Sequence, residues 1–272
     1  MDSLKTDPKF DINRTEEYKL SIQVSLDGFS FSVIHPGEKQ LLALHHSPVP
    51  VSSENLLGRR FEEWFGNEGL LKKKFAKIRL HYSSPKITLV PAKFYDYEKQ
   101  NRLARLVFGN LGVNATRDNY WPGVEGNLVF TIPESLLNVF DQTFPGIVVV
   151  HPLSVYNKRI LQGKSEGGNV MALYFEKSWF SLMLYEDEQH QVVNSFGTSY
   201  PTDVLFYISS VLKQRELSSK NTKLLLAGDV SSDGEIYKML GQWFNDANFF
   251  VPDISYNREL FNESLHRFIP LL

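Results

Sequence analysis

Two segments far apart in the chain show the same order of predicted elements. The first starts at Lys19, and the second, "GGNVMALYFEKSWFSLMLYEDEQHQVVNSFG", starts at Gly167. In both, alternating apolar and polar residues predict three strands joined by short turns. A helix follows in each copy, over residues 52–66 and 202–215, and then a further strand, over 75–82 and 223–227. The repeated order indicates an internal duplication.

The first hairpin contains an Asp-Gly pair in the stretch "VSLDGFSFSVIH". A two-residue turn at Asp27-Gly28 predicts that Val24 pairs with Phe31. With that pairing the apolar side chains of both strands share one face, and the serines share the other. The turn is therefore explained by strand pairing alone, and the question is whether it also holds a ligand.

Charged residues stand at two further turns of the second copy. Aligning "FSFSV" of the first copy with "SWFSL" of the second places Glu176 and Lys177 opposite the Asp-Gly pair. A later buried strand, "KLLLAGDVSSDG", ends at Gly228-Asp229. These four residues, together with Asp27 and Gly28, are the candidate site of the chain.

Two copies of β-β-β-α-β-α, the first with an insertion, resemble the actin-like ATPase fold, which is a duplicated ribonuclease H-like α/β fold. The resemblance extends over nearly the whole chain after residue 18. It is strongest to an uncharacterised bacterial family of about this length, which begins with a strand, a turn similar to "SLDGFSFSV" and a second strand. A more distant similarity is to the actin-like pilus-assembly proteins.

This resemblance implies two halves around a central cleft. The expected division is a flexible N-terminal tail over residues 1–17, a first half over 18–150 and a second half over 151–272. A subdomain is expected as an insertion in the first half, at about residues 92–132.

The resemblance also implies three loops that handle a nucleotide. The first is the hairpin with Asp27 and Gly28, near phosphate and magnesium-bound water. The second is normally Asp-x-Gly-Gly-Gly-Thr, whose backbone N–H groups surround the phosphates; here it reads "YFEKSWFS", with Glu176 for the acid, Lys177 as a charge and no glycine after it. The third is normally a Gly-Gly pair against adenosine, and Asp229 replaces its second glycine.

Because the glycines of the second loop are missing, we expect a degenerate, non-catalytic actin-like protein that binds another protein or self-associates. The alternative is an ATP-binding ATPase or switch with ATP and magnesium as cofactors, in which Asp27 orients the metal and Glu176 polarises the attacking water. The third possibility is a metal-dependent nuclease, in which Asp27, Glu176, Asp229 and Asp233 converge on magnesium.

The charge balance and the composition limit the partners. Lys and Arg total 29 against 31 for Asp and Glu, so the chain lacks the strong positive field that recruits nucleic acid. No cysteine is present, which excludes disulfides and thiolate metal sites. No apolar run approaches the ~20 residues of a membrane span, and the polar N-terminus has no secretory core, so we expect a cytoplasmic protein.

Two aromatic or imidazole pairs have both a structural and a functional interpretation. Tyr120-Trp121 begins a predicted loop over residues 120–126, where exposed aromatics could anchor an interface or pack onto their own domain. His45-His46 lies in a predicted strand, and neighbouring side chains of a strand point to opposite faces. We therefore do not expect the two histidines to bind one metal ion.

Overall fold

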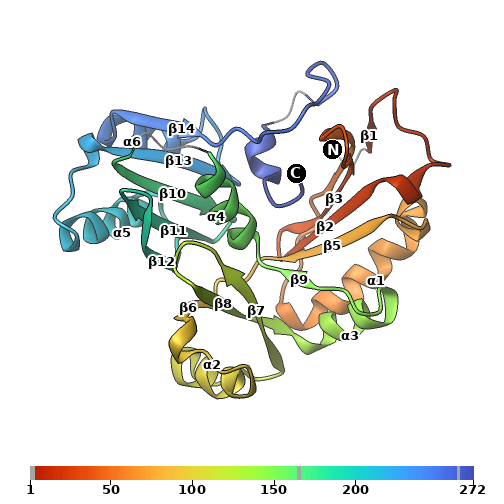
Figure 1. Cartoon of the computed structure of the whole chain (residues 1–272), viewed down its shortest axis with the longest axis horizontal. Helices are drawn as coiled ribbons and strands as arrows, with labels where there is room; N and C mark the ends of the chain where they lie inside the picture. The colour runs from red at the N-terminus through yellow and green to blue at the C-terminus, as the bar shows by residue number, and fades with distance from the viewer. Residues whose placement is uncertain (1–3, 164–166, 262–263) are drawn as a thin grey trace.

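Two sheets form the framework of the protein and lie side by side, with helices packed around them (Figure 1). The computed structural model describes residues 4–163, 167–261 and 264–272. The first sheet contains β1 (Lys5–Thr6), β2 (Lys19–Ser25), β3 (Gly28–His35), β4 (Gln40–Ser47), β5 (Lys77–Tyr82) and β9 (Val149–Val150). The second contains β10 (Asn169–Phe175), β11 (Trp179–Glu186), β12 (Gln189–Gly197), β13 (Thr222–Gly228) and β14 (Asp246–Phe249).

The two sheets repeat one topology. The first has the order β1-β4-β3-β2-β5-β9 and the second the order β12-β11-β10-β13-β14, so they correspond strand for strand once β1 is set aside. In each, the first strand of the copy pairs antiparallel with the second strand and parallel with the strand after the helix. This confirms the predicted α/β fold and its duplication.

Helices bury the apolar faces of both sheets. They are α1 (Leu57–Asn67), α3 (Glu134–Thr143), α4 (Pro152–Gln162), α5 (Pro201–Gln214) and α6 (Glu235–Trp243). On the first sheet, Phe61 of α1 meets Phe140 of α3 edge to face, with ring centres 4.9 Å apart. On the second, Ile208 of α5 is fully buried. The helix α4 contacts both halves, because the Asn157 side chain donates to the Pro122 carbonyl oxygen at 3.2 Å and accepts from the Tyr185 hydroxyl of β11 at 2.6 Å.

The structure corrects the register predicted for the first hairpin. Val24 pairs with Phe29 rather than with Phe31, so the two loop residues come just before Gly28. Gly28 has φ of 138°, and a Cβ atom there would lie 2.2 Å from the Ser47 carbonyl oxygen. The glycine is therefore required within the strand pairing and not in the turn itself. A shift of two residues leaves every side chain on its face, so the predicted apolar face is unchanged.

A small subdomain extends from the first half at the lower end of Figure 1. It contains β6 (Ile87–Pro91), α2 (Gln100–Phe108), β7 (Asn114–Trp121) and β8 (Gly126–Pro133), with the strand order β6-β8-β7. The sequence predicted a loop from Tyr120 onward and missed β7. The strand reads "NATRDNYW" and has no alternation of apolar residues, so its backbone pairing with β8 rather than its side chains defines it.

Both ends of the chain add to the first half. Residues 1–17 were expected to form a flexible tail, yet Lys5 pairs with Leu44 between β1 and β4. At the other end, residues 265–272, which we call the C-terminal segment, return from the second half and pack on β3 and β4. The Ser32 hydroxyl of β3 donates to the Leu271 carbonyl oxygen at 2.6 Å. The C-terminal segment therefore lies between the two sheets (Figure 1).

Candidate functional site

All six candidate residues meet at one cavity between the halves. They come from three separate turns, at the ends of β2, β10 and β13. They are Asp27, Gly28, Glu176, Lys177, Gly228 and Asp229. The strands β2 and β10 carry the same topology in the two halves, so the duplication brings their two hairpins face to face.

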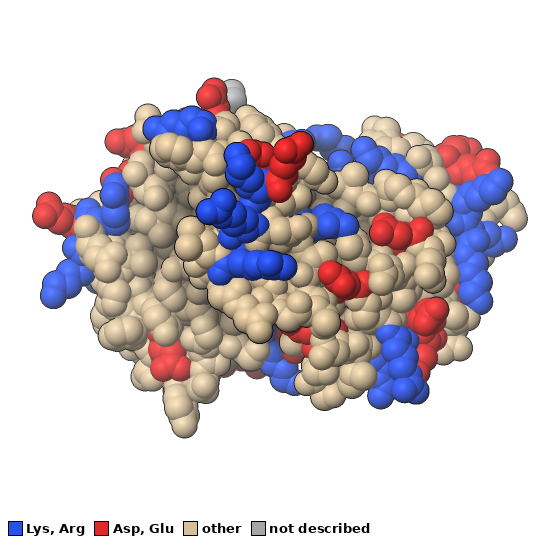
Figure 2. All heavy atoms as spheres, turned by 90° about the horizontal axis from the view of Figure 1, so that it is seen from below, with Lys and Arg blue, Asp and Glu red and all other residues tan. Residues whose placement is uncertain are grey.

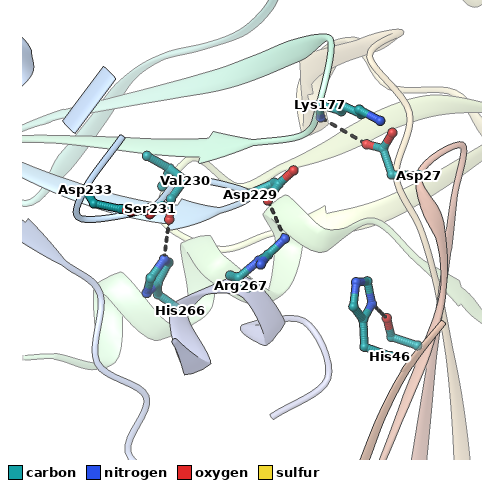
Figure 3. Close-up of polar contacts among 10 residues, drawn as sticks. Asp27, His46, Lys177, Asp229, Val230, Ser231, Asp233, His266 and Arg267 are labelled. Carbon is teal, nitrogen blue, oxygen red and sulfur yellow. Dashed lines mark hydrogen bonds and ion pairs between the residues drawn. The ribbon is translucent and has the colours of Figure 1, made fainter. Parts of the chain in front are cut away.

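The first hairpin is bonded directly to the second across the cavity. The Lys177 backbone N–H donates to the Asp27 carboxylate at 3.0 Å (Figure 3). In the fold that this chain resembles, the same hairpin would offer its backbone N–H groups to phosphate. Here a carboxylate of the protein accepts one of them, and its negative charge opposes a second anion at this position.

Gly228 is required by packing and therefore gives no support to a nucleotide site. Its φ is 83°, and a Cβ atom would lie 2.1 Å from the Phe175 carbonyl oxygen. The end of β13 thus passes directly against the end of β10, an approach that only glycine allows. The following residue is held in the same way, since the Asp229 backbone N–H donates to the Phe175 carbonyl oxygen at 2.8 Å.

The C-terminal segment closes the third turn. Arg267 forms an ion pair with Asp229, and the His266 ring bonds to the Val230 carbonyl oxygen at 2.7 Å (Figure 3). Arg267 and Phe268 line the same cavity as the candidate residues. Sequence reasoning missed both, because they lie nearly forty residues after the turn and no local pattern marks them.

Glu176 is the one carboxylate of the site that is removed from solvent. It is 8% exposed, and its Oε1 atom has no hydrogen-bond partner. Burial raises its pKa to about 8; the Ser83 hydroxyl opposes this shift, and the carboxylates of Asp27 and Asp229 add to it. At neutral pH the side chain is therefore mainly protonated, and it is a poor ligand for a metal cation in that form.

The fourth predicted carboxylate does not join the others. Asp233 bonds to the Ser231 side chain and does not line the cavity (Figure 3). Within residues 4–163, 167–261 and 264–272, no group of three or more His, Cys, Asp or Glu side chains is arranged to hold a metal ion. The convergence of four carboxylates that a nuclease would need is thus absent from the described chain.

The two neighbouring histidines point to opposite sides of β4, as predicted. His46 lines the cavity, and its Nδ1 lies 2.9 Å from the Ser30 hydroxyl (Figure 3). His45 stacks on Phe31 in the core of the first half, with ring centres 5.1 Å apart. The histidine on the cavity side was not among the predicted site residues.

The cavity is small for a nucleotide. Its volume is about 190 Å³, whereas pockets for small molecules usually measure about 300–1,000 Å³. The second hairpin also lacks glycine, and Trp179 is buried at the start of β11. ATP and magnesium therefore do not fit the site in this arrangement.

Comparisons with known proteins identify the family of this chain. Residues 7–246 match a family described as a protein of unknown function, DUF3822. The chain belongs to the DUF3822 family. The order of the predicted elements indicated a resemblance to an uncharacterised family, and this prediction is confirmed. No curated protein matches the sequence.

Solved structures show the same fold for this DUF3822 protein. A protein from Bacteroides thetaiotaomicron, described as having an actin-like ATPase fold and unknown function, is 19% identical. It aligns over 96% of this chain and 98% of its own, with a TM-score of 0.81. The PilM–PilN type IV pilus biogenesis complex contains a chain that is 13% identical. It aligns over 93% of this chain and 95% of its own, with a TM-score of 0.56. At these identities the likeness shows the fold alone.

We expect Asp27→Ala to weaken the contact between the two hairpins. Loss of the acceptor should lower the free energy of unfolding by about 1 kcal/mol and speed hydrogen exchange at the Lys177 amide. Asp27→Asn, which keeps an acceptor oxygen, is the control and should change the exchange rate less. Unchanged exchange in Asp27→Ala would show that the bond does not hold the hairpins together in solution.

Proposed function

We propose that this protein is a non-catalytic actin-like module that acts by binding another protein. The cleft that would hold a nucleotide is closed by groups of the chain itself. The observation that carries this proposal is the bond between Asp27 and the Lys177 N–H. In the actin-like fold a backbone N–H of this hairpin would donate to a phosphate, whereas here it donates to a side chain of the protein. The ion pair between Arg267 and Asp229 supports it at the third turn.

The surface of the inserted subdomain supports a protein partner. Large apolar side chains are concentrated there and open to solvent, namely Phe94, Tyr97, Leu106, Val107, Val113 and Tyr120. Leu106 on α2 is 83% exposed. Exposed apolar surface of this kind is typical of sites where proteins associate. Of the predicted aromatic pair, Tyr120 is 64% exposed and Trp121 is fully buried, so only the tyrosine is available for an interface.

Basic side chains accompany this apolar surface. Lys93, Lys99, Arg102 and Arg105 are exposed in the same subdomain. Figure 2 views the molecule from the side on which α2 lies and shows Lys and Arg gathered near the middle of that face, among scattered acidic groups. A partner with an apolar surface and an acidic rim would be complementary to it, whether it is a different protein or a second copy. The PilM-containing neighbour is itself described in complex with another protein.

The division of the chain and its location belong to the same proposal. We infer a first half over 18–150, with the insertion at about 92–132, and a second half over 151–272. Across the described residues no helix has both the length and the apolar character needed to cross a bilayer. The cytoplasm is the compartment that we propose.

Titration calorimetry with ATP and magnesium tests the non-catalytic character. We expect no saturable heat up to millimolar ATP and no release of phosphate. The variant Arg267→Ala is titrated in the same way, because it removes the ion pair with Asp229 and therefore one contact of the closed cleft. Micromolar binding together with turnover by the unaltered protein would refute the proposal.

An ATP-dependent switch is the second candidate, and one observation favours it. Glu176 lines the cavity and has one carboxyl oxygen without a hydrogen-bond partner, and a raised pKa is also a property of general bases. If this candidate is right, Glu176→Gln abolishes phosphate release while ATP still binds. Equal release by the variant and the unaltered protein would exclude Glu176 from the chemistry.

A further inference from the structure

A second cavity lies between the halves, at the other end of β2. Lys19 begins that strand and lines this cavity, whereas Asp27 comes two residues after the end of the strand and lines the first cavity. At about 3.3 Å per strand residue the two ends are on the order of 20 Å apart. The second cavity has a volume of about 610 Å³, which is within the range of about 300–1,000 Å³ that small-molecule sites occupy.

Basic side chains from both halves line this cavity. Lys19 and Arg79 come from β2 and β5, and Lys158 and Arg159 come from α4. The register pairs Lys19 with Lys77 and Ser21 with Arg79, so Lys19 and Arg79 project from the same face of the first sheet. A chain of net charge −2 thus collects a strong local excess of positive charge.

A single acidic group compensates only part of this excess. Asp253 is the acidic side chain among the described residues that line the cavity, and it already pairs with Lys39 at 3.2 Å. In the described parts of the chain, the side chains of Lys19, Arg79 and Arg159 make no hydrogen bond or ion pair of their own. Burial, with repulsion from Arg79 and Arg159, lowers the pKa of Lys19 to about 8. Burial also lowers the pKa of Arg159; Asp253 opposes this shift, and repulsion from Arg79 adds to it.

Such an arrangement is unfavourable unless an anion is present. Partly buried cations that repel one another cost folding free energy, and proteins usually pair them or leave them in water. Guanidinium groups present forked donors that match phosphate oxygens, and lysine adds a mobile charge. The remaining wall includes Phe250, Val251 and Ile254, which would accommodate an apolar part of the ligand.

We propose that this cavity is a binding site for a small organic molecule that carries two or more phosphate groups. Lys19, Arg79 and Arg159 bind the phosphates, and Lys158 lies at the same wall. The ligand would contact both halves, since β2 and β5 belong to the first sheet and α4 joins it to the second. This site is independent of the closed cleft and of the protein-binding role proposed above.

Inorganic pyrophosphate is the probe for calorimetry and thermal unfolding. Pyrophosphate should bind saturably and raise the unfolding temperature, and added sodium chloride should weaken binding. Arg159→Gln should weaken binding at least tenfold, because a hydrogen bond to a charged group contributes about 1.5–3 kcal/mol. The matched control is Arg59→Gln on α1, an exposed arginine outside the cavity, which should bind as the unaltered protein does.

A second variant gives a measurement that does not depend on binding. Without any phosphate, Lys19→Met should raise the unfolding temperature, because it removes a repelled charge and keeps the length of the side chain. With pyrophosphate the same variant should gain less stability than the unaltered protein. A lysine with only a structural role would instead lose stability on substitution.

Three further arms distinguish the class and source of the ligand. Citrate, which carries carboxylates, should bind more weakly than pyrophosphate, and vesicles that contain phosphatidic acid should not bind. Absence of saturable pyrophosphate binding would overturn the proposal. Equal weakening by Arg59→Gln and Arg159→Gln would also overturn it, because binding would then be non-specific. Tight binding to the vesicles alone would assign the basic residues to a lipid surface and contradict the small-molecule site.

Discussion

Gly228→Ala should lower the free energy of unfolding by on the order of 4 kcal/mol. Two causes add. The φ of 83° is unfavourable for alanine, and the new methyl group would lie 2.1 Å from the Phe175 carbonyl oxygen. Relief of that clash would separate the ends of β10 and β13, which pair in register up to these two residues. Urea unfolding, followed by circular dichroism, measures the loss.

A second glycine provides the matched control for this substitution. Gly146 has φ of 76°, yet a Cβ atom there would meet nothing within 4 Å. Gly146→Ala therefore isolates the backbone cost and should lose only about 1–2 kcal/mol. If the two variants lost equal stability, the close approach at Gly228 would not be the reason for its glycine.

Glu176→Gln should stabilise the protein at pH 8 and leave it unchanged in acid. In the folded protein Glu176 keeps its proton up to about pH 8, whereas in the unfolded chain it ionises near the ordinary value of 4.5. The unfolded state therefore releases its proton first, and the free energy of unfolding falls as the pH rises from about 4.5 to about 8. Glutamine stays neutral, so the variant avoids a loss of at most about 4 kcal/mol.

Urea unfolding at pH 5 and at pH 8 measures this difference. The control is Glu62→Gln on the exposed side of α1, which should behave as the unaltered protein does at both values. A constant difference between Glu176→Gln and the unaltered protein would show that Glu176 does not carry a raised pKa.

Much of the fold was predictable because the two copies repeat one pattern. The alternation of apolar residues placed the hairpins, and the order of elements gave the topology of both sheets. The register of the first hairpin was wrong by two residues, because the need for glycine at position 28 comes from Ser47, which belongs to β4 and lies far along the chain. The strand β7 was missed because it is stabilised by its pairing with β8.

The candidate site was predictable in its residues and less so in their contacts. The alignment of the two copies brought together Asp27, Glu176 and Lys177, which all line one cavity. No sequence pattern indicated that Asp27 would bond to the Lys177 backbone. The contribution of Arg267 to the site was equally hidden, since it depends on how the C-terminal segment returns between the sheets.

Two contacts within the protein close the cleft. In an open actin-like cleft, backbone N–H groups are available to bind phosphate, and a carboxylate is available to bind a metal ion. Here Asp27 is bonded to Lys177, and Asp229 is paired with Arg267. The two hairpins are thus bonded to each other, and the third turn is paired with the C-terminal segment. Binding of a nucleotide would first have to break these contacts and would lose their stabilisation.

The backbone amide of Lys177 tests the central claim most directly. In a ¹⁵N-labelled sample its NMR signal reports whether the N–H remains bonded to Asp27. On addition of millimolar ATP and magnesium we expect the signal to keep its position, while Asp27→Ala alone shifts it. A saturable shift of the Lys177 amide on addition of ATP and magnesium to the unaltered protein would show that the cleft still binds phosphate and would contradict the account.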